Sequence, residues 1–246
     1  VPGPAEPYGR EGLPLDQARE RLLDDLGRGP CLACETLPLS QCLGRVNREA
    51  ITATAAVPGF RASIMDGYAL GQQQQPQVGQ QWTLKGRSAP GAPFSPTLKS
   101  GEAIRILTGA PVPAGSGWVL PQELVQQDNA TITLTQEASS SPWILPPDEE
   151  CAPGDQLLPA GVRLGAAELG RLAGCGVARL CVSRQPRIGL LISGDELIAA
   201  GQERHPGAIW ESNGTLLAAL LQQLDYGIHE QRVEADQPDA LRQALQ

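Results

Sequence analysis

Two adjacent carboxylates, Asp195 and Glu196, follow a short apolar run at residues 187–192 and a turn pair, Ser193-Gly194. Such a run is typical of a buried strand in a parallel sheet, and open α/β sheets bind ligands where their strands end. The glycine would let backbone N–H groups approach an anion, and the carboxylates offer the oxygen ligands that a hard cation prefers. The same residues also fit the start of a helix, whose first turn favours acidic side chains.

A third carboxylate, Asp66, lies in the segment 57–69, where the pairs Pro58-Gly59 and Asp66-Gly67 both predict turns. Ser63 and Asp66 are expected on the loop between these turns. Asp66 is therefore a candidate functional carboxylate. The alternative is an Asx-turn, in which the side chain bonds its own backbone, and this is the commoner use of Asp-Gly.

Thr108-Gly109 ends an expected strand and is followed closely by Pro111 and Pro113. The two rigid prolines would fix a loop that presents the Thr108 hydroxyl and backbone N–H groups. That arrangement suits a phosphate or an oxyanion, although a plain β-turn explains the same residues.

The other polar groups are weaker signals. Acidic residues occur at Glu123, in the pair Gln122-Glu123, and at residues 148–150. Acidic side chains at strand ends are usually exposed to water and have no further role. Cys31 and Cys34 form a single C-x-x-C, and the chain has only two histidines. Because a zinc site needs a second such pair or added histidines, we expect no metal at these cysteines.

Composition limits the class of protein. The 246 residues are 41% hydrophobic but only 4% aromatic, which allows two or three domains with aliphatic cores. A net charge of −8 argues against a nucleic-acid-binding protein, which needs clustered Lys and Arg. No apolar run approaches the length of a membrane span, so a cytoplasmic location is expected by default. Six scattered cysteines fit free thiols in a reducing compartment.

Periodicity and turn residues predict the following order of elements. Residues 1–12 are expected to be a disordered lead-in. Strands of a small β-domain are expected around 82–84, 103–107, 118–120 and 131–134. Further strands are expected at 177–182, 187–192 and 226–233. Helices are expected at 13–26 with Asp16 as its cap, at 165–173, from Ser212 or Asn213 with a leucine stripe, and from near Asp236. Two parallel strands do not make a stable sheet, so the last domain is expected to be incomplete or completed from outside.

Three segments in this order resemble the molybdenum insertase family, which comprises the bacterial MoeA proteins and the gephyrin E-domain. They are residues 58–69, 106–113 and 193–197. Supporting similarities are Glu35-Thr-Leu-Pro-Leu39 with Gly44-Arg-Val46, Gln122-Glu123, and Ser212-Asn213 before the long helix.

The resemblance implies an α+β multi-domain fold. An elongated N-terminal α+β domain, 13–50 and 143–185, would be interrupted by a small β-domain, 51–142. An α/β domain similar to molybdopterin-binding domains would start at 186 and be incomplete at 246, so the chain would be C-terminally truncated relative to the family. The family forms homodimers, and a homodimer is therefore expected here.

The resemblance also implies an activity: insertion of molybdate into adenylated molybdopterin with release of AMP, a transferase reaction. Molybdopterin-adenylating proteins and acceptor molybdoenzymes would be partners. By motif position, the catalytic residues would be Asp66, Thr108 and Glu196, the substrate-binding residues Ser63, Gly109, Ser193, Gly194 and Asn213, and the Mg²⁺ ligands Asp195, Glu196 and Glu150. The alternative is a truncated, non-catalytic homologue that serves as a dimerisation or scaffold module.

Overall fold

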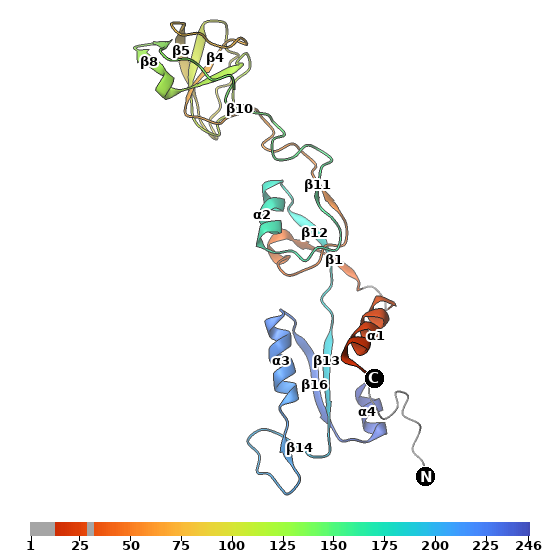
Figure 1. Cartoon of the computed structure of the whole chain (residues 1–246). Coiled ribbons are helices and arrows are strands. Elements are labelled where there is room, and N and C mark those ends of the chain that lie inside the picture. The colour runs from red at the N-terminus through yellow and green to blue at the C-terminus, as the bar shows by residue number, and fades with distance from the viewer. Residues whose placement is uncertain (1–12, 29–31) are drawn as a thin grey trace. The chain divides into compact units, whose positions relative to one another are not determined.

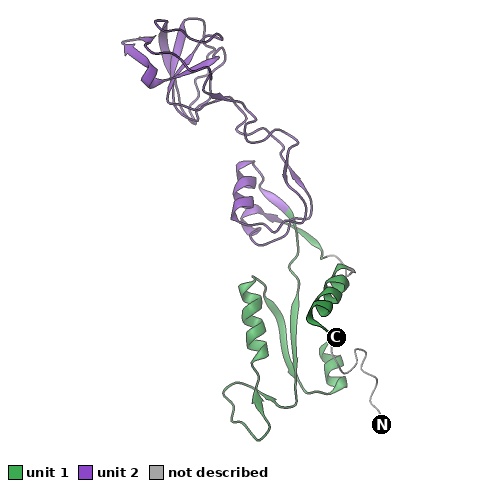
Figure 2. Cartoon of the chain, viewed as in Figure 1, with its two compact units in different colours: residues 1–36, 181–246 green, residues 37–180 purple. Residues whose placement is uncertain are grey.

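The structure is a computed structural model that describes residues 13–28 and 32–246. The predictions for residues 1–12 and for Cys31 lie outside the described residues. The chain divides into two compact units, shown in Figure 2. We call residues 37–180 the central unit, and residues 1–36 with 181–246 the terminal unit.

A six-stranded sheet dominates the central unit, and three of its strands, β4, β5 and β8, are labelled in Figure 1. The strand order is β7-β4-β6-β5-β9-β8. Only β5 and β6 run parallel; the other neighbours are antiparallel. The four strands expected from apolar runs are all present. The bounds are β4 Gly67–Leu70, β5 Gln81–Ser88, β6 Glu102–Ile106, β7 Trp118–Pro121, β8 Val125–Asp128 and β9 Thr131–Leu134.

Alternation along these strands places apolar side chains on both faces of the sheet. Leu70 and Leu120 belong to one buried cluster, whereas Ile104 and Val119 belong to the other. Successive side chains of a strand point to opposite faces, which separates neighbours such as Val119 and Leu120. The first cluster also contains Tyr68, Trp82 and Trp118. The core is therefore less purely aliphatic than the composition predicted.

Short elements complete the central unit. Strand β2 pairs with β11, and β3 with β10, both antiparallel. Asn47 anchors the segment before β2, as it is 1% exposed and its amide bonds the carbonyls of Glu49 and Pro159 at 2.8 and 2.7 Å. The bounds are β2 Ile51–Thr52, β3 Ala62–Ser63, the 3₁₀ helix η2 Gln122–Leu124, β10 Ile144–Leu145, β11 Gln156–Leu158 and α2 Ala166–Gly174. Strands β1 (Cys34–Pro38) and β12 (Arg179–Ser183), within which the boundary between the units falls, pair with each other, and the 3₁₀ helix η1 (Leu39–Gln41) follows β1.

The terminal unit contains the expected strand–helix–strand–helix order. Parallel strands β13 (Ile188–Ser193) and β16 (Ile228–Glu234) are joined through α3 (Asn213–Gln223), and α4 (Pro238–Ala244) follows. Helix α1 (Leu15–Arg28) belongs to the same unit. Two short strands, β14 (Leu197–Ile198) and β15 (Ile209–Trp210), pair in the segment expected to be a polar loop.

Burial in the terminal unit differs from the prediction of a buried strand. Of β13, only Ile192 is buried. The reason is that, in the described part of the chain, β13 has one partner strand. The leucine stripe of α3 is largely exposed as well, at 41–57% for Leu216, Leu217, Leu220 and Leu224.

The predicted helix starts agree with the structure in place but differ in how they are capped. Asp16 lies inside the first turn of α1 rather than before it. Ser212 precedes α3 but makes no side-chain cap hydrogen bond; Glu211 Oε1 instead accepts one from the Gly214 N–H at 2.6 Å. Helix α4 begins at Pro238, after Gln237, which agrees with a start predicted near Asp236. At α3, the Glu211 side chain is long enough to reach the unpaired N–H groups of the first helical turn from one residue before Ser212. No helix in the described residues is long and apolar enough to cross a membrane.

Candidate functional site

Strand register gathers three of the sequence motifs at one edge of the six-stranded sheet. Gly67, at the start of β4, is in register with Ile106 at the end of β6 and with Pro121 at the end of β7. Because β4 is antiparallel to both neighbours, the loops before β4 and after β6 and β7 lie at the same edge. Asp66, Thr108 and Gln122 therefore come together from distant parts of the chain.

Gly67 is required by the close approach of these strands. A Cβ at this position would lie 1.8 Å from the backbone oxygen of Leu120, closer than real Cβ contacts allow. The residue after Asp66 must therefore lack a side chain, which gives a packing reason for the Asp-Gly pair.

The carboxylate of Asp66 is fixed by Thr108. Its Oδ1 accepts one hydrogen bond from the Thr108 N–H and another from the Thr108 hydroxyl, each 2.7 Å. Both side chains are exposed. The backbone and hydroxyl hydrogen bonds from Thr108 lower the pKa of Asp66, with a smaller contribution from the charge of Arg105. These two bonds join the loop before β4 to the loop after β6. The Asp66 Oδ1 therefore does not bond its own backbone, as the Asx-turn alternative would require.

Backbone hydrogen bonds join the same two segments. The carbonyl of Ser63 accepts from the Gly109 N–H at 2.8 Å, and the Ser63 N–H donates to Ala110 at 3.0 Å. Ser63 is 1% exposed, and its hydroxyl donates to the carbonyl of Met65 at 2.7 Å. Its role in the structure is to hold the loop that carries Asp66, and a contact with substrate stays a prediction.

The loop at Thr108 and Gly109 does not present spare backbone donors. The N–H groups of Thr108, Gly109 and Ala110 donate to Asp66, Ser63 and Leu107, respectively. Gly109 has a φ of +75°, the conformation that favours glycine at the third position of a type II turn. The turn is therefore a plain β-turn that presents the Thr108 hydroxyl. Its three backbone N–H groups are already used and do not form the expected anion site.

Arg105 adds a cation that the sequence patterns did not identify. It faces Tyr68 across the β4–β6 pair, and its guanidinium lies 5.1 Å from the centre of the tyrosine ring. The guanidinium also donates to the side-chain oxygen of Gln122. The sequence does show that a charged residue, Arg105, interrupts the apolar positions of β6. The side chains beside Arg105 depend on strand register, which the sequence does not give.

The other candidate carboxylates lie in the terminal unit, after β13. Asp195 and Glu196 are both exposed. Asp195 Oδ1 accepts from the Asp236 N–H at 3.0 Å, which joins this turn to the end of β16. The residues after Glu196 form β14, so the alternative of a helix start is wrong. The turn at the end of the strand agrees with the motif-based prediction.

The remaining predicted residues fall at the ends of the same elements. Ser193 is the last residue of β13 and is exposed, whereas Gly194 is buried, and its N–H donates to Glu234 at 3.2 Å. Asn213 is the first residue of α3 and is exposed. Their contact with substrate stays a prediction.

Glu150 belongs to the central unit and is exposed in the segment before β11. Its N–H donates to Val57 at 3.0 Å. Among the described residues, no three His, Cys, Asp or Glu side chains gather closely enough to hold a metal ion. Carboxylate oxygens remain the right ligand type for Mg²⁺, which usually takes only one or two protein carboxylates alongside water and substrate phosphates.

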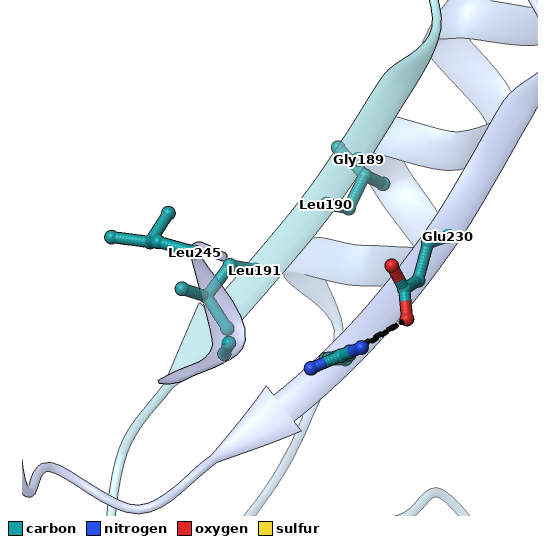
Figure 3. A pocket seen from close by; sticks show the side chains of 7 residues that line it. Gly189, Leu190, Leu191, Glu230 and Leu245 are labelled. Atoms are coloured by element: carbon teal, nitrogen blue, oxygen red, sulfur yellow. Dashed lines mark hydrogen bonds and ion pairs between the residues drawn. The ribbon is translucent and has the colours of Figure 1, made fainter. Parts of the chain in front are cut away.

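A separate open pocket of about 200 Å³ lies along the parallel strands of the terminal unit (Figure 3). Leu190 and Leu191 of β13 and Leu245 line it, beside the ion pair of Glu230 and Arg232 at 2.6 Å. None of its lining residues is a predicted site residue, so this pocket is distinct from the motif residues.

Comparison with known proteins agrees with the placement of the motifs. The sequence model of the MoeA N-terminal region (domain I and II) matches residues 13–176, more than half of the chain. The chain belongs to the MoeA family. The match includes the segments that carry Asp66, Thr108 and Glu150.

Similar proteins extend this MoeA relationship beyond residue 176. The chain is 34% identical to the molybdopterin molybdenumtransferase of Haemophilus influenzae over 86% of this chain and 52% of that protein. It is 32% identical to molybdopterin molybdenumtransferase 2 of Mycobacterium tuberculosis, over 83% of this chain and 51% of that protein. The MoeA crystal structure from Pyrococcus horikoshii superimposes with a TM-score of 0.81 at 25% identity, covering 95% of this chain and 62% of that one. The chain thus spans about half the length of the curated relatives it matches.

Proposed function

We propose that this chain is part of a molybdopterin molybdotransferase, which inserts molybdate into adenylated molybdopterin and releases AMP. The observation that carries the proposal is the Asp66–Thr108 pair, an exposed carboxylate held by two 2.7 Å hydrogen bonds. The relatives named molybdopterin molybdenumtransferases support the same reaction class.

Asp66 would act by orienting a hydrogen-bond donor of the substrate. An ionised carboxylate only accepts hydrogen bonds, and both bonds from Thr108 use Oδ1. Oδ2 is therefore the oxygen available for a donor of the pterin or for a water molecule. Thr108 holds the carboxylate in one orientation, and its hydroxyl oxygen retains lone pairs that can accept a further hydrogen bond.

Asp195 and Glu196 of the terminal unit are proposed Mg²⁺ ligands, and Glu150 of the central unit is proposed as a further one. When bound, Mg²⁺ supplies positive charge that neutralises a phosphate and polarises it for cleavage. The protein's part is to hold the exposed Glu196 carboxylate beside Asp195, whose Oδ1 is already oriented by the Asp236 N–H. The substrate contacts proposed for Ser193 and Gly194 lie in this same turn, and the one proposed for Asn213 lies at the start of α3.

We also propose that the protein is a homodimer. Apolar side chains on two helices of the terminal unit support it. On α1, Leu15, Leu22 and Leu26 are 83, 65 and 76% exposed, and the leucines of α3 are also uncovered. Burying such surface against a second copy would remove apolar area from water. A molybdopterin-adenylating protein and molybdoenzyme acceptors are the further partners proposed.

Complementation tests the proposed reaction. The complete protein that carries this chain should restore a molybdoenzyme in a bacterial strain that lacks its own insertase. The variants Asp66→Ala and Glu196→Ala should fail to do so while remaining folded. Asp128→Ala, which removes an exposed carboxylate at the end of β8, is the matched control and should restore activity. Failure of the wild-type protein, despite normal expression, would favour the scaffold alternative.

A further inference from the structure

Two cysteines of the central unit lie side by side although 24 residues separate them in sequence. The Sγ atoms of Cys151 and Cys175 are 3.8 Å apart. Cys151 is buried, at 4% exposure, whereas Cys175 is partly exposed. Neither residue belongs to the candidate site or to its motifs.

The pair connects two different parts of the central unit. Cys151 forms an isolated antiparallel bridge with Val57, and its carbonyl accepts from the Val57 N–H at 3.0 Å. Cys175 is the residue that follows α2, and its N–H donates to Arg171 at 3.1 Å. A covalent bond between the sulfurs would therefore tie the segment that carries Glu150 to the end of a helix.

Free buried cysteines often serve simply as small apolar side chains. The separation of the sulfurs argues for more here. A disulfide needs an S–S distance of about 2.05 Å, so the two sulfurs must approach by only about 1.8 Å from their 3.8 Å separation. Side-chain rotation supplies movements of this size.

We propose that Cys151 and Cys175 form a reversible dithiol–disulfide site that exchanges with glutathione disulfide. The Cys175 thiolate attacks one sulfur of glutathione disulfide, which forms a mixed disulfide and releases one glutathione thiolate. The Cys151 sulfur, after losing its proton to solvent, then attacks the Cys175 sulfur and expels the second glutathione. The two cysteines lose two electrons and two protons, and glutathione disulfide is reduced to two glutathione molecules.

Exposure sets the order of the two steps. Glutathione disulfide is a bulky reagent that can reach the partly exposed Cys175 but not the buried Cys151. Cys151 therefore suits the role of the resolving thiol, which attacks only after Cys175 has formed the mixed disulfide.

Mass spectrometry of the whole chain tests the proposal. Cys31→Ser and Cys34→Ser are introduced first, to remove the C-x-x-C pair as a competing source of disulfide. The protein is equilibrated with reduced and oxidised glutathione, trapped with iodoacetamide and digested without reductant. We expect the intact protein to lose about 2 Da before alkylation, and the digest of the alkylated protein to contain one cross-linked peptide pair, Cys151 with Cys175. Dithiothreitol should reverse both changes.

Single substitutions distinguish the two roles. Cys151→Ala should stop the reaction at a mixed disulfide between glutathione and Cys175, whereas Cys175→Ser should leave Cys151 as a free thiol. Cys181→Ser removes another partly exposed thiol and should leave the cross-link unchanged. Because Cys151→Ala alters a buried position, the fold of this variant is checked by circular dichroism. The peptide map of the parent protein tests the proposal even if the variant fails to fold. Stable glutathione on Cys175 in the parent protein, a cross-link to a different cysteine, or two free thiols in oxidised glutathione would each overturn the proposal.

Discussion

The Asp66 carboxylate is held by Thr108 through two hydrogen bonds to one oxygen, each 2.7 Å long, although 42 residues separate the two in sequence. The pairing of β4 with β6 brings them together, and the close approach at Gly67 leaves no room for a side chain beside Asp66. An exposed carboxylate oriented in this way does not depend on burial for its position. It can therefore remain ionised and accessible at the same time.

The two hydrogen bonds predict a titration that can be followed directly. The pKa of Asp66 should lie below its ordinary value, because both bonds favour the charged form. Thr108→Val removes the hydroxyl and keeps the backbone N–H, so it should raise this pKa only part of the way back. Carbon-13 NMR titration of the aspartate carboxyls measures both. An unshifted Asp66 in the wild-type protein would contradict the geometry.

The same shift predicts how stability changes with pH. A lowered folded-state pKa means that the stabilisation is full above the unfolded value of about 3.9 and disappears as pH falls through the folded value. The melting-temperature advantage of the wild type over Asp66→Asn should therefore be constant near neutral pH and shrink in acid. An advantage that grows on acidification would show that the sign is wrong.

Arg105 should act on the same carboxylate through charge. Its guanidinium contributes to the low pKa of Asp66, so Arg105→Gln should raise that pKa by less than the loss of both Thr108 hydrogen bonds would. Added salt should weaken the effect, since the groups are exposed to solvent. The control is Lys85→Gln, which removes a cation that pairs with Glu102 at the opposite end of β6. Equal shifts from the two variants would mean that the effect is one of net charge only.

Gly67 offers a test of the strand packing that positions Asp66. Gly67→Ala should destabilise the chain severely, by about 4 kcal/mol or more, because the new Cβ meets the Leu120 carbonyl and cannot avoid it. Gly170→Ala is the matched control. It lies in α2 with no atom within 4 Å of the new Cβ, and should stabilise by roughly 0.5–1 kcal/mol. Urea denaturation measures both, and a tolerated Gly67→Ala would show that β4 and β7 are less closely packed than described.

Asn47 predicts a second large effect in the central unit. Its side chain donates to two carbonyls and accepts from the Val162 N–H at 2.7 Å, all in a buried setting. Asn47→Ala leaves these groups without partners and should cost about 3 kcal/mol or more. Gln126→Ala, on the exposed side of β8, should stay within about 0.5 kcal/mol of the wild type in the same denaturation experiment.

How much could be predicted from the sequence depended on whether the signal was local. Apolar runs and turn pairs correctly predicted the strands that precede Thr108 and Asp195, because they are properties of a few neighbouring residues. Arg105 was missed because its neighbours, Tyr68 and Gln122, are set by strand register across the sheet. Glu211 rather than Ser212 accepts the hydrogen bond at the start of α3. The sequence does not distinguish them, because both side chains are acceptors close to the same N–H groups. The incomplete burial of β13 could not be predicted from its apolar residues, since burial depends on what packs against the strand.

The central claim is that Asp66 serves catalysis rather than folding. The most direct measurement is the rate at which the complete protein incorporates molybdate and releases AMP, compared with Asp66→Asn under saturating substrate. Losing an orienting carboxylate should reduce this rate on the order of 10²-fold or more. The variant should remain folded near neutral pH and lose only the small melting-temperature advantage that the ionised carboxylate gives, because the side chain is exposed on a turn. A wild-type rate in Asp66→Asn would contradict the account, and Asp66 would then be only the acceptor that fixes the Thr108 turn.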